Sequence, residues 1–184
     1  MKKVIVFMAD GMEMCECLIV VDLLRRAGTE VTTASVMGRT EVKSSHGVMI
    51  SADVLAEDAD YESADMIILP GGTVGTAHLA SSEVVKEQCL IFSRDKYIAA
   101  ICAAPTVLAG LGLLENRRAT CHPGVEENMA GALLTHSGIS VDHNIITGRA
   151  LGASFDFGLR IAEILEGPDA VHKVRQGICY EKQV

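Results

Sequence analysis

The sequence is poor in aromatic side chains: they make up 4% of its 184 residues, and tryptophan is absent. A hydrophobic content of 49% with 22% charged residues nevertheless excludes a disordered chain and is typical of a globular protein. Its core must therefore be built from aliphatic side chains, alanine and methionine, as in helices stacked on a central sheet. The length suits one unit, and no linker or repeat is present, so we expect residues 1–184 to form a single domain.

Two further shortages limit the partners of the chain. Basic residues form nothing larger than pairs such as Arg25-Arg26 and Arg117-Arg118, and the formal net charge is −8. Because nucleic-acid binding needs a clustered basic face, we expect no nucleic-acid partner. Apolar runs such as residues 66–69 are far too short to span a bilayer, and the first residues lack a secretory pattern. We therefore expect a cytoplasmic protein with no membrane partner.

Cysteine, by contrast, is well represented. The six cysteines are Cys15, Cys17, Cys89, Cys102, Cys121 and Cys179. No pair has zinc-ribbon spacing, and the C-x-C at 15–17 is a poor metal site because alternate residues of a helix face different directions. Cytoplasmic thiols stay reduced, so we expect neither disulfides nor a metal, and each cysteine is first interpreted as a small buried hydrophobe.

Strand-like and helix-like segments alternate along the chain. Apolar or β-branched runs predict strands at 2–8, 30–36, 64–69 and 97–101, with short later strands at 118–123 and 144–148. Helical spacing predicts helices at 16–27, 81–94, 104–114 and 152–167, with stops at Gly28 and Gly167 and a last helix starting at Pro168. Residues 40–53 are expected to form short strands outside the main sheet. The alternation predicts parallel strands joined by right-handed crossovers, which is a three-layer α/β sandwich.

Cys102 is placed differently from the other cysteines. It directly follows the strand at 97–101, and functional groups of a doubly wound sheet gather at the carboxyl ends of its strands. A thiol at a helix start faces the positive end of the helix dipole, which favours the thiolate. The small Ala103 and Ala104 leave the sulfur accessible, and Pro105 is tolerated in a first helical turn. Cys102 is therefore a candidate nucleophile.

Backbone amides near Cys102 could hold a developing oxyanion. Gly71 and Gly72 end the strand at 64–69, and without side chains they let an amide approach a reacting oxygen. The N–H of Ala103 points from the helix start. The plainer interpretation is that Pro70-Gly71-Gly72 is only a tight turn.

Three side chains are candidates for proton transfer. Glu16 lies at the start of the first helix, where a carboxylate is ordinarily just a favourable charge, but it could instead share a proton with Cys102. Glu13 competes for that role, and helix geometry does not choose between them. His122, which ends a short strand, is the best histidine candidate for a base.

Four stretches carry a resemblance to a known family. They are "VIVFMADGMEMCECLIVVDLLRRAGTEVTTASV", "IILPGGTVG", "AAICAAPTVLA" and "SFDFGLRIAEIL". In order and spacing they resemble the DJ-1/ThiJ/PfpI superfamily over nearly the whole chain, closest to its DJ-1-like branch. The resemblance implies a flavodoxin-like sandwich, a homodimer and no cofactor.

The same resemblance implies roles for single residues. It assigns the reactive cysteine to Cys102 and a protonated glutamate bonded to it to Glu16, in preference to Glu13. The amides of Gly72 and Ala103 match the oxyanion positions of the family, and His122 matches a histidine found near the cysteine in many members.

Three positions depart from the family pattern. The protease-like branch has histidine directly after the cysteine, where this chain has Ala103, which argues against a peptidase. DJ-1-like members often have arginine where this chain has His46, and a Gly-Pro step where it has Ala150-Leu151. These changes affect the expected lining of the pocket.

We expect a cofactor-free, cysteine-dependent enzyme acting on a small aldehyde or on reactive dicarbonyls such as methylglyoxal, or on their adducts, in the manner of a glyoxalase or deglycase. The alternative is a redox sensor or chaperone-like stress protein that works through oxidation of Cys102 to a sulfinate. A nucleotide-binding module is disfavoured because neither a G-x-G-x-x-G fingerprint nor a P-loop is present.

Overall fold

The computed structural model describes residues 1–180, and its main sheet is mostly parallel. The strands in spatial order are β10 (Ile139–Asp142), β11 (Ile145–Gly148), β7 (Tyr97–Ile101), β6 (Met66–Leu69), β1 (Lys3–Met8), β2 (Glu30–Ser35) and β5 (Val54–Leu55). Only the β10–β11 pair is antiparallel within this sheet. The carboxyl ends of β1, β6, β7 and β11 therefore meet at one edge.

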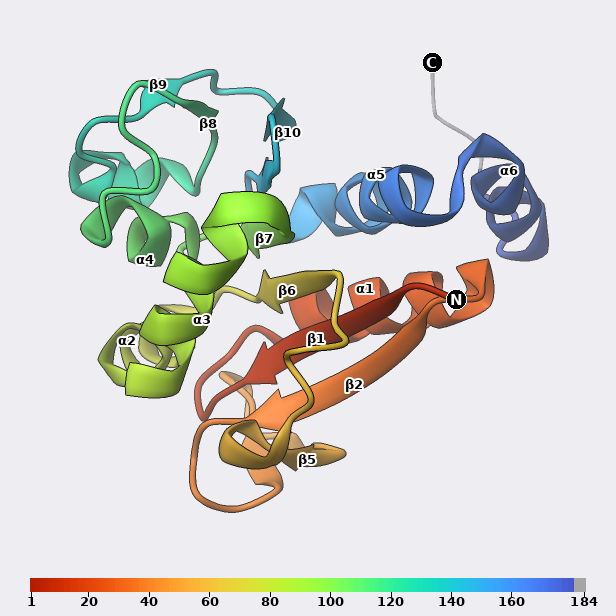
Figure 1. The fold of residues 1–184 in the computed structure, drawn as a ribbon, viewed down its shortest axis with the longest axis horizontal. Helices are drawn as coiled ribbons and strands as arrows, with labels where there is room; N and C mark the ends of the chain where they lie inside the picture. Colours follow the sequence, from red (N-terminus) through yellow and green to blue (C-terminus); the bar gives the residue numbers. More distant parts are fainter. Residues whose placement is uncertain (181–184) are drawn as a thin grey trace.

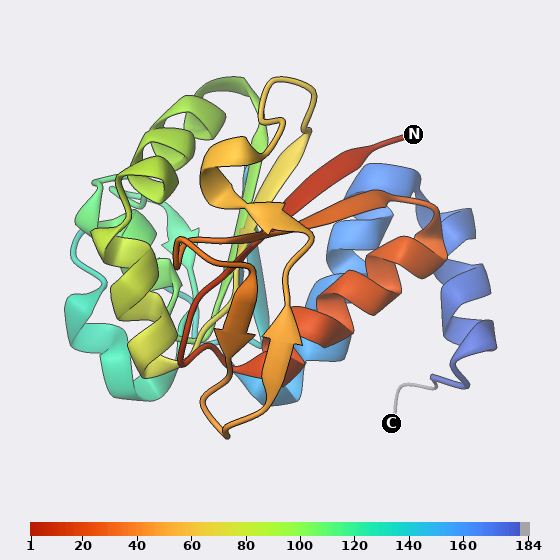
Figure 2. The ribbon, with the colours of Figure 1, turned by 90° about the horizontal axis from the view of Figure 1, so that it is seen from below.

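Helices cover both faces of the sheet (Figures 1 and 2). One layer contains α1 (Met14–Ala27), α5 (Ser154–Glu166) and α6 (Pro168–Gly177), and the other contains α2 (Thr73–Ser81), α3 (Glu83–Asp95) and α4 (Pro105–Gly110). This arrangement confirms the three-layer α/β sandwich predicted from the sequence.

Alternate residues of β1 show how the strands fill two cores. Val4, Val6 and Met8 belong to the cluster that includes α1 and α5, whereas Ile5 and Phe7 belong to the cluster on the side of α2 to α4. All five side chains are at most 3% exposed. Because successive side chains of a strand point to opposite faces, a sheet covered on both faces requires such a continuous apolar run.

The smaller elements lie outside the main sheet. They are the hairpin β3 (Glu41–Lys43) and β4 (Met49–Ser51), the pair β8 (Arg118–Ala119) and β9 (Leu133–Leu134), and the 3-10 turns η1 (Ala56–Asp58), η2 (Pro123–Asn128) and η3 (Leu151–Ala153). The β3–β4 hairpin confirms the excursion expected at 40–53. Among residues 1–180, no helix has both the length and the apolar content needed to cross a membrane.

Two helices differ from expectation. The helix after Cys102 occupies Pro105–Gly110 and is shorter than the predicted 104–114. Helix α2 was not predicted, because its sequence shows no clear apolar stripe and contains Gly75. A Cβ at Gly75 would lie 2.6 Å from the Cα of Met12, so this glycine allows α2 to approach the loop after β1.

Candidate active site

Cys102 sits on a strained turn between β7 and α4. Its φ is +65°, a left-handed value that non-glycine residues rarely adopt. The backbone is held from both sides, because the Cys102 N–H donates to the Gly148 carbonyl (2.9 Å) and its carbonyl accepts from the His122 N–H (2.8 Å). Strain of this kind persists only where the surroundings impose it, and it is typical of functional sites.

Glu16 lies in the first turn of α1 and is 1% exposed. Its Oε2 accepts a hydrogen bond from the Gly71 N–H (3.0 Å), and its carboxyl group is also bonded to the Leu151 amide and to the Cys102 thiol. The choice between two glutamates that helix geometry left open is thus decided by contact: Glu16 meets the cysteine.

Glu13 precedes α1 and acts as its N-cap. Its Oε1 accepts from the Cys15 N–H (3.3 Å), and its Oε2 accepts from the Ser45 hydroxyl (3.2 Å). The ring of His46 lies near the same carboxylate, with Nδ1 3.6 Å from Oε2. Glu13 therefore connects the start of α1 to the loop between β3 and β4, at the edge of the cavity that contains Cys102.

The amides of Gly72 and Ala103 are hydrogen-bonded to the Cys102 sulfur. Gly72 has φ +92°, and a Cβ there would lie 2.5 Å from the Gly11 carbonyl oxygen, so only glycine fits this turn. The amide of Gly71 has another function, because it donates to Glu16. A Cβ at Gly71 would also meet the Cβ of Cys102 at 2.6 Å.

Burial controls the ionisation of the Glu16–Cys102 pair. It raises the pKa of the Glu16 carboxyl to about 7. Burial and then the Glu16 charge raise the pKa of the Cys102 thiol to about 12, against the amides of Gly72 and Ala103, which lower it. The amides near the helix start thus lower the pKa of Cys102 as expected, but burial and the Glu16 charge outweigh them. The thiolate is instead favoured when Glu16 keeps its proton and loses its charge.

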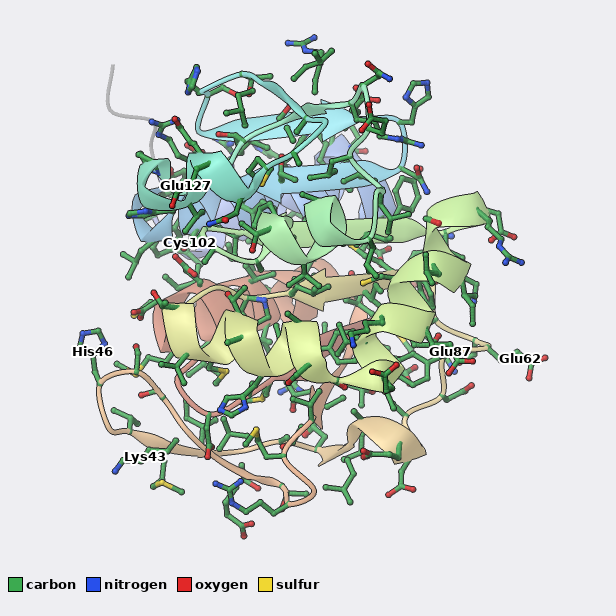
Figure 3. The ribbon with its side chains drawn as sticks, turned by 90° about the vertical axis from the view of Figure 1, so that its left-hand side faces the viewer. Lys43, His46, Glu62, Glu87, Cys102 and Glu127 are labelled. Atoms are coloured by element: carbon green, nitrogen blue, oxygen red, sulfur yellow. The ribbon has the colours of Figure 1, made fainter. Side chains whose placement is uncertain are left out.

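A cavity of about 260 Å³ opens onto the pair. Its lining residues are Glu13, Glu16, Gly72, Thr73, Cys102, Ala103, His122, Val125, Ala150 and Leu151. His122 is exposed, and its Nδ1 accepts a hydrogen bond from the Gly124 N–H (3.0 Å). In Figure 3, Cys102 and His46 lie on the same side of the molecule. The cavity thus brings together the candidates at positions 16, 72, 102, 103 and 122.

Sequence reasoning missed several groups of this cavity. Thr73 and Val125 lie on elements, α2 and η2, that the sequence did not predict. The Leu151 amide bonds Glu16 through the backbone, so its side chain carried no signal of that role. Among residues 1–180, no group of three His, Cys, Asp or Glu side chains is arranged to hold a metal ion.

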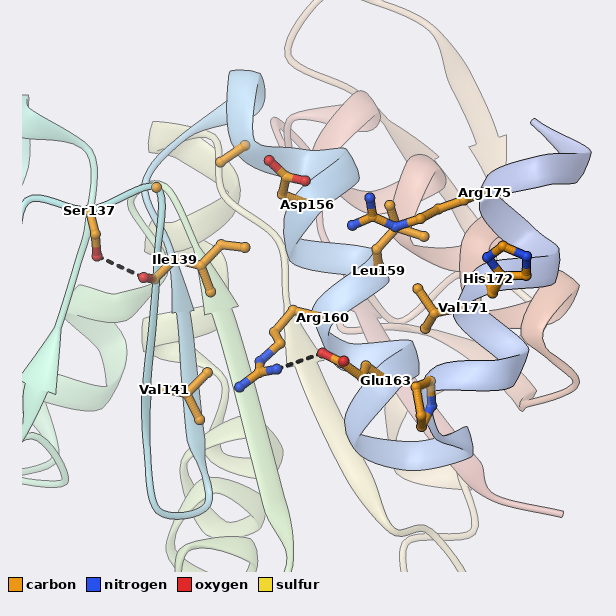
Figure 4. A pocket seen from close by; sticks show the side chains of 13 residues that line it. Ser137, Ile139, Val141, Asp156, Leu159, Arg160, Glu163, Val171, His172 and Arg175 are labelled. Carbon is orange, nitrogen blue, oxygen red and sulfur yellow. Dashed lines mark hydrogen bonds and ion pairs between the residues drawn. The ribbon is translucent and has the colours of Figure 1, made fainter. Parts of the chain in front are cut away.

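A larger cavity, about 740 Å³, lies between β10, α5 and α6 (Figure 4). It includes the ion pair between Arg160 and Glu163 (2.5 Å) and the side chains of Asp156, His172 and Arg175. Its lining contains no cysteine. We therefore place the candidate active site at the smaller cavity, which holds the strained cysteine and the buried carboxyl group.

Fold and site together define a class: α/β sandwiches that present a cysteine on a strained strand-to-helix turn beside a buried glutamate. The profile of the DJ-1/PfpI family matches residues 2–164. The chain belongs to this family and, within it, to the DJ-1-like branch.

Individual relatives agree over almost the full length. The Parkinson disease protein 7 homolog of Danio rerio is 40% identical over 179 residues, which cover 95% of each chain. The glutathione-independent glyoxalase DJR-1.2 of Caenorhabditis elegans is 34% identical over 179 residues, covering 94% of this chain and 93% of that one. The structure of oxidized Toxoplasma gondii DJ-1 matches with a TM-score of 0.93 at 31% identity, covering 98% and 99% of the two chains.

Proposed function

We propose that this protein is a cofactor-free, cysteine-dependent enzyme that converts reactive dicarbonyls or hydrolyses their adducts, as glyoxalases and deglycases do. The observation that carries the proposal is the contact of one sulfur, that of Cys102, with the Glu16 carboxyl group and with the Gly72 and Ala103 amides. A nucleophile, a proton carrier and an oxyanion site are the three parts that carbonyl addition requires. The name of the nematode relative supports a carbonyl substrate.

In the proposed reaction the Cys102 thiolate attacks the aldehyde carbon of methylglyoxal, and the C=O electron pair moves to oxygen. The amides of Gly72 and Ala103 stabilise the oxyanion, which takes the proton of Glu16 to give a hemithioacetal. The Glu16 carboxylate then removes the proton from this carbon to give an enediolate and returns it to the neighbouring carbon, while the hydroxyl proton on the first carbon passes to the neighbouring oxygen. The first carbon is thereby oxidised to a thioester and the second is reduced to a secondary alcohol. Water hydrolyses the resulting thioester to lactate and frees the thiolate, and no external oxidant is needed.

His122 is proposed as a further catalytic residue, one that donates a hydrogen bond to the reacting group. It lines the cavity, and its backbone N–H is bonded to the Cys102 carbonyl. Because Nδ1 accepts the Gly124 N–H, the ring proton is held on Nε2. In this tautomer the Nε2–H can donate a hydrogen bond to the thioester oxygen while water attacks, which is the role that we propose for the ring.

The direct test is lactate formation from methylglyoxal without glutathione, with release of amine from a methylglyoxal adduct measured in parallel. Turnover of either substrate supports the proposal. Failure to turn over both, with a protein whose Cys102 is reduced by mass spectrometry, would overturn it.

The pH dependence of Cys102 alkylation tests the shared proton. The Glu16–Cys102 pair loses its first proton near pH 7, because burial raises the Glu16 pKa to about that value. We expect the rate with iodoacetamide to rise through pH 7 and then level off, since one proton remains shared between the two groups. A rate that climbs tenfold per pH unit to pH 9 without levelling would show an isolated thiol instead.

The second candidate function is redox sensing through the same sulfur. One similar structure is that of oxidized Toxoplasma gondii DJ-1, and in this chain a neutral Glu16 would donate a hydrogen bond to a Cys102 sulfinate. Two equivalents of peroxide would supply the two oxygen atoms and leave as water. Peptide mass analysis after mild peroxide should find both oxygens on Cys102, and oxidation spread evenly over the six cysteines would contradict this role.

We further propose a cytoplasmic homodimer in which the whole chain acts as one domain. Leu18 on α1, Met49 on β4 and Phe155 on α5 are exposed apolar side chains, and α1 packs against α5. Light scattering on the purified protein distinguishes a dimer from a monomer.

A further inference from the structure

The side chains that line the Cys102 cavity are all acidic or uncharged. The lining contains two carboxyl groups, Glu13 and Glu16, and neither lysine nor arginine. Glu16 shares one proton with Cys102, and Glu13 is the second acidic side chain of the lining. The Glu13 side chain is 15% exposed, and both of its oxygens accept hydrogen bonds, from the Cys15 N–H and the Ser45 hydroxyl.

Neither histidine near the cavity supplies a fixed positive charge within it. The Nδ1 of His122 is occupied as the acceptor of the Gly124 N–H. The side chain of His46 is 72% exposed, and its Nδ1 lies 3.0 Å from the Ser45 hydroxyl and 3.6 Å from Glu13. Its ring therefore lies largely in water, where charge is strongly screened.

We propose that Glu13 determines the charge preference of this pocket, disfavouring anionic carbonyl compounds and favouring neutral or cationic ones. Disfavoured substrates include 2-oxo acids and phosphorylated aldehydes, and favoured ones include dicarbonyl adducts of amines and guanidines. The effect reaches the reacting atoms, because the Glu13 charge contributes to the raised pKa of Glu16. The statement about substrates rests on the proposed function, whereas the charge preference itself does not.

Alkylation of Cys102 by two reagents of different charge tests this preference without any turnover. Iodoacetate is an anion and iodoacetamide is neutral, and in both the sulfur bonds to carbon as iodide leaves. For each protein we compare the iodoacetate-to-iodoacetamide rate ratio at Cys102, divided by that of free cysteine. At low ionic strength we expect Glu13→Gln to raise this ratio about fivefold, as loss of one nearby unit charge predicts. A change in thiolate fraction affects both reagents equally and cancels.

Glu30→Gln is the matched control, since it removes the same charge from an exposed position at the amino end of β2, away from the site edge. It should leave the ratio unchanged. Wild-type protein offers a second measurement that needs no variant: about 1 M salt should raise the ratio by screening Glu13. An equal ratio in wild type and Glu13→Gln, or no response of wild type to salt, would overturn the proposal.

A substrate comparison separates this inference from the proposed function. Glu13→Gln should lower kcat/KM for a cationic arginine adduct of methylglyoxal relative to that for methylglyoxal itself. If wild type turns over neither compound but shows the charge-dependent alkylation, the proposed function fails and the charge preference holds. If turnover is normal and the alkylation ratio does not respond to Glu13, the reverse is true.

Discussion

Replacing Cys102 with serine is expected to lower kcat for lactate formation by about 10³-fold or more, as removal of a nucleophile does in other enzymes. The serine hydroxyl is a far weaker acid than a thiol, and the Glu16 carboxyl, with a pKa of about 7, cannot ionise it. The remaining amides of Gly72 and Ala103 would still bind an oxyanion but would have no covalent adduct to stabilise. Steady-state lactate measurement gives the number directly.

Cys179→Ser is the matched control, because this cysteine is exposed and lies outside the cavity. It should keep wild-type kcat. Thermal unfolding of Cys102→Ser should resemble that of wild type, since the hydroxyl occupies nearly the same space as the thiol. Equal turnover by Cys102→Ser and wild type would exclude the covalent mechanism.

The second large effect is expected for Glu16→Gln, which should lower kcat about 10²- to 10⁴-fold, the usual contribution of a positioned acid or base. The amide can still accept from the Gly71 N–H and donate to the Cys102 sulfur, so the geometry is kept and only proton transfer is lost. Alkylation by iodoacetamide checks that Cys102 remains accessible in the variant.

The same substitution is expected to stabilise the protein above pH 7. The folded state holds the Glu16 proton up to about pH 7, whereas the unfolded chain releases it near the ordinary value of 4.5. Stability contributed by this group is therefore greatest below pH 4.5, falls between pH 4.5 and 7, and is constant above. The difference between a pKa of about 7 in the folded state and 4.5 in the unfolded chain lowers the free energy of unfolding by about 3 kcal/mol above pH 7. A glutamine at this position does not titrate and so avoids this loss.

Urea unfolding of both proteins from pH 5 to 8 isolates the contribution of Glu16, because all other titrating groups are shared. The gap between the variant and wild type should widen as pH rises to 7 and then remain constant. A variant that is less stable than wild type at pH 8 would show that the buried carboxylate contributes favourably to the fold.

Most of the fold could be predicted, because a sheet that is buried on both faces requires strands with continuous apolar runs, and such runs are visible in the sequence. The apolar runs of β1, β6 and β7 and the helical spacing of α1 and α5 were predicted within a few residues. Helix α2 was not predicted, because it is short and contains Gly75. This glycine allows close contact with Met12, a residue far away in the sequence, so no local pattern explains it. The antiparallel strand β10 was missed as well, since a short edge strand carries little periodicity.

The sequence by itself determined the sandwich and the placement of Cys102 at the working edge, because strand order along the chain dictates which loops meet there. The residue pattern alone did not choose between Glu16 and Glu13; the family resemblance favoured Glu16, and only the tertiary structure gave the physical reason. The two carboxyl groups are three positions apart on the chain, and their roles differ because Glu16 is buried against the Gly71 amide whereas Glu13 caps α1. The raised pKa values of Glu16 and Cys102 likewise arise from burial between segments far apart in sequence, which no local pattern encodes.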